Sequence, residues 1–162
     1  MPVKHAIISP DLKYRYRLTR CWDPEATLLA WIMLNPSTAD GVSDDPTIRR
    51  CISFARRWGY GGIQVCNLFA LRSPTPRVLE SAADPVGPAN DTWLIGTLLK
   101  GNPVIAAWGA CQVALQRRRA TYVRETLFAQ SGHNVFCLGL TATGQPKHPL
   151  FTRNDTAPKP FD

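Results

Sequence analysis

Residues 27–40 read TLLAWIMLNPSTAD, a nearly continuous apolar run that stops at an asparagine and a proline. An apolar run without alternation is typical of a strand that is buried on both faces, as in a parallel sheet. Asn35 follows the run directly, and an asparagine amide is costly to bury unless it is paired. We therefore expect a central strand over residues 27–34 and a functional loop from Asn35 to Asp45.

The same pattern returns along the chain and alternates with helical periodicity. Apolar residues at helical spacing predict a helix that Asp45 caps and Pro46 opens. Two more helices are expected over about 88–100 and 110–130, and further buried strands over 63–69, 103–108 and 134–140. Strands that alternate with helices favour right-handed βαβ units and parallel pairing.

The segment 11–21 has a different pattern. Tyr14, Tyr16 and Leu18 alternate with Arg15, Arg17 and Thr19. This alternation predicts a half-exposed strand, which we expect to pair antiparallel at an edge of the sheet. The expected fold is a three-layer α/β/α sandwich with a mainly parallel central sheet and an antiparallel edge strand. We expect residues 1–162 to form a single α/β domain.

The chain is basic, with 19 lysines and arginines against 12 acidic residues and a net charge of +7. This balance favours polyanionic partners, such as nucleic acid or a nucleotide. Arginines on the first helix can form either a solvated face or a surface that meets phosphates. The residues that we expect to contact phosphate are Arg49, Arg72 and Arg117.

Several classes of protein are disfavoured by the sequence. No segment approaches the roughly 20 apolar residues of a membrane span, and the N-terminus is too short and broken for a signal peptide. The five cysteines are spread singly, without a C-x-x-C pair, which favours buried reduced thiols over a zinc or iron–sulfur site. We expect a cytoplasmic protein with no membrane partner, no metal and no cofactor.

Ligands of open parallel sheets bind outside the carboxyl ends of the strands. That rule selects four loops, over residues 35–45, 67–72, 109–112 and 141–150.

Two of these loops contain side chains suited to chemistry. Asn67 presents a donor and an acceptor side by side, which complements the amide-like edge of a nucleobase; the alternative is a buried asparagine that fixes the next loop. His148 can donate to a developing anion, or it is an ordinary histidine of a surface loop.

Taken together, the motifs resemble a bacterial family called domain of unknown function 1643, over nearly the whole chain. That resemblance implies no particular activity. The segments that carry it are 14–18 (YRYRL), 31–40 (WIMLNPSTAD), 45–51 (DPTIRRC), 67–70 (NLFA), 84–88 (DPVGP), 106–109 (AAWG) and 148–150 (HPL).

The order of the strand-end motifs is also similar to the uracil-DNA glycosylase superfamily, which implies a parallel-sheet α/β/α fold. In that superfamily the first motif holds the polar residue that positions water, and Asn35-Pro36 matches the Asn-Pro of the mismatch-specific branch. A strand-end asparagine recognises the base, which corresponds to Asn67. A closing His-Pro motif stabilises the leaving base and grips the DNA backbone, which corresponds to His148-Pro149. Ser37 and Leu150 stand where the superfamily usually has glycine and serine.

These features lead to three hypotheses. The first is an N-glycosidic hydrolase, similar to a DNA glycosylase, that acts on a modified base in nucleic acid or on a nucleotide. The second is a non-catalytic nucleic-acid or nucleotide-binding module on the same fold, and the third is a small-molecule enzyme unrelated to nucleic acid. Whether the site turns over, and the oligomeric state, are left open.

The first hypothesis assigns roles to individual residues. The catalytic candidates are Asn35, with Asp40 or Asp44 beside it to position water, and His148. The candidates for substrate binding are Pro36, Ser37, Thr38, Asn67 and Lys147.

Overall fold

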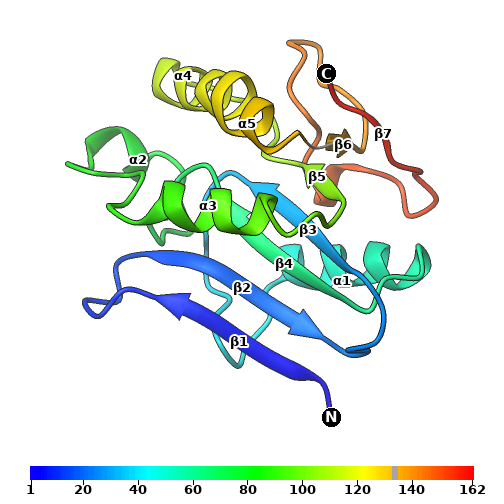
Figure 1. Cartoon of the computed structure of the whole chain (residues 1–162). Coiled ribbons are helices and arrows are strands. Elements are labelled where there is room, and N and C mark those ends of the chain that lie inside the picture. Colours follow the sequence, from blue (N-terminus) through cyan, green and yellow to red (C-terminus); the bar gives the residue numbers. More distant parts are fainter. Residues whose placement is uncertain (133–134) are drawn as a thin grey trace.

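Seven strands form one sheet in the order β1-β2-β4-β3-β5-β6-β7 within residues 1–132 and 135–162, which the computed structural model describes (Figure 1). The four central strands, β4, β3, β5 and β6, pair in parallel, whereas β1, β2 and β7 are antiparallel to their neighbours. The expected α/β fold with a parallel central sheet is therefore confirmed. The strands are β1 (Val3–Ile8), β2 (Arg15–Cys21), β3 (Leu28–Met33), β4 (Gly62–Asn67), β5 (Val104–Ala106), β6 (Val135–Cys137) and β7 (Lys159–Pro160).

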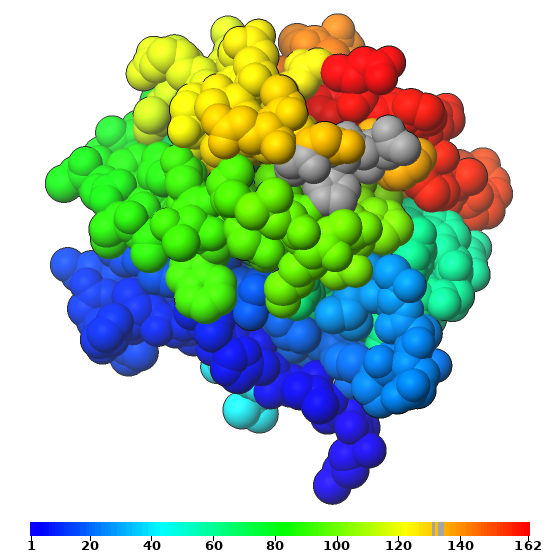
Figure 2. Space-filling model, viewed as in Figure 1, coloured from blue at the N-terminus to red at the C-terminus, as the bar shows by residue number. Residues whose placement is uncertain are grey.

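Helices cover both faces of the sheet. Helix α1 packs on one face, in a core cluster that includes Trp31 and Phe54, and the later helices pack on the other, around Leu94 and Trp108. Figure 1 shows α1 behind the sheet and α3 in front of it, and Figure 2 shows the front helices as a closed surface. The helices are α1 (Pro46–Arg57), α2 (Val78–Ser81), α3 (Asn90–Leu98), α4 (Ala114–Tyr122), the π-helical turn η1 (Val123–Phe128), α5 (Ala129–Ser131) and the 3-10 turn η2 (Pro149–Phe151).

The strands expected over 27–34, 63–69 and 103–108 correspond to β3, β4 and β5, each shorter than its apolar run. The strand expected over 134–140 corresponds to β6, although Asn134 lies outside the described residues. The third expected helix begins later than predicted, at Ala114.

The expectation for residues 11–21 was wrong in one respect. This segment forms β2, but β2 is not an edge strand, because β1 pairs on its outer side from Val3 to Ile8. As a result β2 is mostly buried: Arg15 and Arg20 keep only 2% and 3% of their surface exposed. Strand β1 was missed because its six residues, three exposed and three half-buried, show no clean alternation.

Two expectations about the environment of the chain can be compared with the structure. Among the described residues, no helix has the length and apolar character needed to cross a membrane. Four of the five cysteines are buried and all five are free, as expected. Burial raises the pKa of Cys51 and Cys66 and raises that of Cys111 to about 11, so these thiols stay protonated near neutral pH.

The parallel register brings several strand ends to one edge of the sheet. Met33 pairs with Asn67, and Ile32 pairs with Ala106, so β3, β4 and β5 end close to the same level. The chain leaves β3 for β4 on one side and continues to β5 on the other, and such a reversal of strand order opens a crevice. The first turn of α1 lies beside this edge, where Asp45 caps the helix by accepting from the Ile48 amide at 2.9 Å.

The end of β4 is anchored to α3 by a buried asparagine. Asn90 is fully buried, and its Nδ2 donates to the carbonyl oxygens of Asn67 and Leu68 at 3.0 and 3.1 Å. The Arg119 Nε, from α4, donates to the same Leu68 carbonyl at 2.7 Å. These bonds fix the backbone that carries Asn67.

Substitution Asn90→Ala is expected to lower the free energy of unfolding by about 2 kcal/mol, because the two carbonyls lose their shared side-chain donor in a dry environment. Urea unfolding followed by circular dichroism measures this change, with an unaltered m-value. The exposed Asn154→Ala serves as the control and should change stability by less than about 0.5 kcal/mol. Equal stability of the two variants would contradict the anchoring role of Asn90.

Candidate functional site

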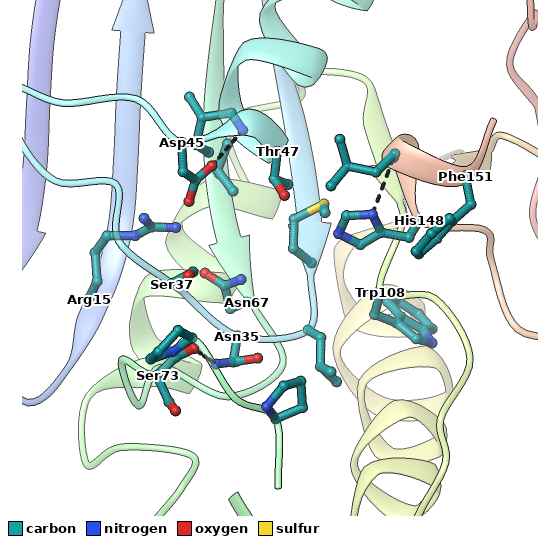
Figure 3. A pocket seen from close by; sticks show the side chains of 17 residues that line it. Arg15, Asn35, Ser37, Asp45, Thr47, Asn67, Ser73, Trp108, His148 and Phe151 are labelled. Atoms are coloured by element: carbon teal, nitrogen blue, oxygen red, sulfur yellow. Dashed lines mark hydrogen bonds between the residues drawn. The ribbon is translucent and has the colours of Figure 1, made fainter. Parts of the chain in front are cut away.

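A cavity of about 330 Å³ opens at the carboxyl ends of the central strands (Figure 3). Its walls come from the ends of β3 and β4, from the start of α1, from the loop over 73–76 and from the segment over 148–151. Its lining residues are Arg15, Met33, Leu34, Asn35, Ser37, Asp45, Thr47, Ile48, Val65, Asn67, Ser73, Pro74, Pro76, Trp108, His148, Leu150 and Phe151. The strand-end rule therefore agrees with the position of this cavity.

Four of the predicted site residues meet in this cavity: Asn35, Ser37, Asn67 and His148. They come from segments more than a hundred residues apart, and Figure 3 shows them around one space. Three others lie elsewhere in the loop. Pro36 is buried behind the wall, Thr38 is exposed and Asp40 is half-buried outside the lining.

The two ends of the Asn35 amide have different roles: the nitrogen bonds to backbone carbonyls and the oxygen is free. Its Nδ2 donates to the carbonyl oxygens of Ser73 at 2.9 Å and Pro36 at 3.1 Å. These bonds hold the loop after β3 against the loop after β4. Its Oδ1 accepts no hydrogen bond from the described residues, and Figure 3 shows it turned away from Ser73. Asn35 can therefore offer one acceptor to a water molecule or a ligand.

Asn67 is the least satisfied polar side chain of the lining. It is 2% exposed, and its Oδ1 is buried without a hydrogen-bond partner. Most buried amides are paired, so an unpaired one in a cavity wall indicates a group whose partner is a ligand or water. The assignment of oxygen and nitrogen in an amide can be exchanged, so the side chain offers one donor and one acceptor.

His148 has a defined tautomer. Its Nδ1 accepts from the Leu150 amide at 3.2 Å, which leaves the hydrogen of the neutral ring on Nε2. Burial lowers the pKa of His148 below its usual value, against the opposing influence of the Asp45 carboxylate, so the ring is neutral near pH 7. Figure 3 shows the other nitrogen directed into the cavity. The site therefore contains one neutral N–H donor from His148.

Arg50 holds the His148 segment in place from α1. Its Nε donates to the Pro149 carbonyl at 3.2 Å and its guanidinium also bonds to the Thr152 carbonyl. This arginine was expected to belong to a solvated or phosphate-facing surface. Instead it satisfies carbonyls of a segment about a hundred residues further along the chain.

The three aspartates of the loop have different surroundings. The Asp40 carboxylate accepts from the amides of Val42 and Ser43 at 2.8 and 2.7 Å, which lowers its pKa and closes a tight turn. The Asp44 carboxylate pairs with Arg20 at 2.7 Å. Asp45 alone among the three lines the cavity. Sequence reasoning treated Asp45 as a helix cap, which it is, and so overlooked its second carboxylate oxygen.

Arg15 is a second residue that the sequence analysis missed. It begins β2, lines the cavity and is 2% exposed. One guanidinium nitrogen donates to the Ala39 carbonyl at 2.8 Å. The alternating pattern placed Arg15 and Arg17 on the same face of a half-exposed strand, so nothing local distinguished them. Arg17 instead lies over the ring of Trp93, with its guanidinium carbon 4.9 Å from the ring centre.

The arginines expected to contact phosphate do not line this cavity. Each donates to a backbone carbonyl on a different segment: Arg49 to Asp44 at 2.6 Å, Arg72 to Leu12 at 3.3 Å and Arg117 to Cys111 at 3.2 Å. Their role in phosphate binding stays a prediction.

Lys147 lines a second cavity of about 310 Å³ beside the first. The two cavities share Trp108, His148 and Phe151 as walls. Trp108 is fixed between them because its Nε1 donates to the Gln145 side chain at 2.8 Å. Where the chain is described, no three histidine, cysteine, aspartate or glutamate side chains come together in the way a metal ion requires.

The tautomer and pKa of His148 can be measured by NMR. We expect a ring nitrogen spectrum typical of the Nε2–H form at pH 7, and a pKa below the ordinary value of 6.5. Because the unfolded chain then binds a proton more readily than the folded one, stability falls as pH drops from above 6.5 through the lower folded pKa. This pH-dependent loss should shrink in His148→Gln. An equal loss in both proteins would contradict the buried neutral ring.

The comparison of the chain with known proteins gives one match. A family model described as "Protein of unknown function (DUF1643)" matches residues 15–150. No curated protein and no solved structure matches the chain. The matched region includes every residue that lines the cavity except Phe151, and so includes Arg15, Asn35, Asn67 and His148. Because the match spans most of the sequence, the chain belongs to the family of proteins of unknown function DUF1643.

Proposed function

We propose that the cavity binds a nucleobase, and that the protein is an N-glycosidic hydrolase acting on a modified base in nucleic acid or on a nucleotide. The observation that carries this proposal is the buried amide of Asn67, which has an unpartnered oxygen in the cavity wall. A carboxamide pairs with the adjacent donor and acceptor of a base edge in a single planar contact.

The size and walls of the cavity suit a planar ring. Its volume of about 330 Å³ is at the small end of the range for ligand sites. Met33, Ile48, Pro74 and the buried Trp108 supply apolar surface. Polar groups converge from a few positions, which is the usual composition of a site that orients one small ligand.

His148 is suited to stabilise a departing base. Breaking the bond between a base nitrogen and the sugar carbon leaves the electron pair on the base, where a ring carbonyl oxygen carries much of the charge. The neutral Nε2–H of His148 can donate to that oxygen, and the bond strengthens as the charge develops. The free base is then protonated from solvent.

A carboxylate is needed on the other side of the reaction, to orient water towards the sugar carbon and accept its proton. The sequence suggested Asp40 or Asp44 for this role. We assign it to Asp45, because Asp45 is the carboxylate that lines the cavity and one of its oxygens is not used by the helix cap. The free Oδ1 of Asn35 is a further acceptor in the cavity wall.

We further propose that the fold is of the uracil-DNA-glycosylase type. The support is that the first, middle and last motifs of that resemblance, at Asn35, Asn67 and His148, contribute to one cavity. Ser37 and Leu150, which differ from the usual glycine and serine, both line the cavity as well.

A non-catalytic binding module is the second candidate. One observation favours it: the Nδ2 of Asn35 and the Asp40 carboxylate, both predicted to serve catalysis, are used to hold loops together. In that case the cavity would retain the base without cleaving it. No comparable observation favours a small-molecule enzyme unrelated to nucleic acid.

Incubation with oligonucleotides that carry uracil, hypoxanthine or other altered bases tests the proposal. We expect abasic sites and free base from at least one substrate, single-stranded or double-stranded. Substitution Asp45→Asn keeps a good helix cap but removes the carboxylate that accepts the proton of water. It is expected to lower the rate of base release by about a hundredfold or more.

The exposed Asp155→Asn is the matched control, since it makes the same change far from the cavity and should keep the full rate. Turnover that survives Asp45→Asn would exclude the assigned carboxylate. Absence of any product, together with base binding that survives Asn35→Ala and Asp40→Ala, would instead establish the binding module.

A further inference from the structure

Three arginines are buried in the part of the chain that the structure describes, and they differ in how their charge is balanced. Arg20, 3% exposed, pairs with Asp44 at 2.7 Å. Arg119, 8% exposed, pairs with the carboxylate of Asp91. Arg15, 2% exposed, has no carboxylate oxygen within 4.0 Å of its guanidinium among the described residues. Buried charges in proteins are nearly always paired, and Arg15 is the exception: the Asp45 carboxylate acts on it only from beyond contact distance.

The hydrogen bonds of Arg15 are incomplete too. One terminal nitrogen donates to the Ala39 carbonyl, whereas its Nε is buried without an acceptor. Burial lowers the pKa of Arg15 to about 10, which still leaves the guanidinium charged at neutral pH. Arg15 is also the member of the three that lines the cavity, and Figure 3 shows its guanidinium directed towards the side of the cavity where Asp45 lies.

We propose that Arg15 binds an anionic group of the ligand, so that the cavity takes a planar ring that carries a carboxylate or another oxyanion. That the ligand is a planar ring follows from the function proposed above, whereas the anion site is inferred from Arg15 alone. A guanidinium with free donors in a dry cavity makes strong, charge-assisted hydrogen bonds to an oxyanion.

The position of Arg15 assigns the charge to the ring and not to a phosphate. Arg15 is on β2, inside the cavity and almost fully buried, whereas the opposite wall is formed by Leu150 and Phe151, which are 45% and 83% exposed. A sugar and its phosphate must leave the cavity towards solvent, past the exposed wall. The group that reaches Arg15 is therefore a substituent on the buried edge of the ring.

Asp45 is the charge that opposes this binding. Its carboxylate lines the same cavity, and its negative charge is partly offset by the Ile48 amide at the start of α1. An anion in the cavity is attracted by Arg15 and repelled by Asp45. Substitution Asp45→Asn should therefore tighten binding of an anionic ring while leaving a neutral ring nearly unaffected.

Calorimetric titration of the wild-type protein with matched pairs of ligands tests the inference. The first pair is uracil-6-carboxylate and uracil, and the second is benzoate and benzamide. We expect the carboxylate of each pair to bind about tenfold more tightly, because a charge-assisted bond replaces a neutral one. Equal affinity for the two members of both pairs would overturn the inferred anion site, and the wild-type protein alone is enough for this test.

Substitution Arg15→Gln should abolish the preference, and Arg15→Lys, which keeps the charge but not the fork of donors, should retain part of it. The exposed Arg118→Gln makes the same change in net charge outside the cavity and should preserve the preference. Circular dichroism and melting temperature verify that each variant is folded. A preference that persists in folded Arg15→Gln would overturn the assignment.

The same titrations separate this inference from the proposed function. If benzoate binds through Arg15 and neither pyrimidine binds, the anion site stands and nucleobase binding fails. If uracil binds as tightly as its carboxylate, nucleobase binding stands and the anion site fails. A third pair, uridine 5′-monophosphate and uridine, completes the test: an Arg15-dependent preference for the phosphate would overturn the assignment of the anion to the ring.

Discussion

The parallel pairing of β3 with β4 on one side and β5 on the other is the constraint on which the rest of the site depends. It places Met33 opposite Asn67 and Ile32 opposite Ala106, so that three chain segments leave the sheet at one level. This register is also fixed by packing, because a slip by one residue would exchange the side chains that β3 packs against α1 with those that it packs against the later helices. The residues that follow each strand therefore lie around one crevice.

The register does not by itself fix the loops that follow the strands, and three polar contacts restrain them. Asn90 fixes the end of β4, the Nδ2 of Asn35 joins the loops after β3 and β4, and Arg50 holds the segment of His148 against α1. Each contact satisfies backbone carbonyls that lack strand or helix partners. This explains why polar residues predicted to act on a ligand also have structural bonds: one side chain can use its donor for a loop and offer its acceptor to the cavity.

Prediction from the sequence succeeded where the signal was local. The apolar run before Asn35, the cap at Asp45, the strand end at Asn67 and the His148-Pro149 pair are each contained in a few neighbouring residues, and the rule for parallel sheets joined them. Prediction failed where the burial of a strand depends on which other strand pairs with it. The segment of β2 has the alternation of an exposed edge, and only the pairing of β1 outside it makes Arg15 interior. The choice among Asp40, Asp44 and Asp45 likewise depends on where the loop turns.

Arg15, whose burial was not predicted, also carries the most specific information about the proposed ligand. A buried amide such as Asn67 is compatible with many neutral rings, because its donor and acceptor suit any molecule with an amide-like edge. A buried guanidinium is far more selective, since the cost of an unpaired charge in a dry site is much greater than that of an unpaired amide. Arg20 and Arg119 avoid this cost with carboxylates from the chain. Arg15 has none in contact and is acted on by Asp45 only at longer range, so the proposed anionic group of the ligand would complete its pairing.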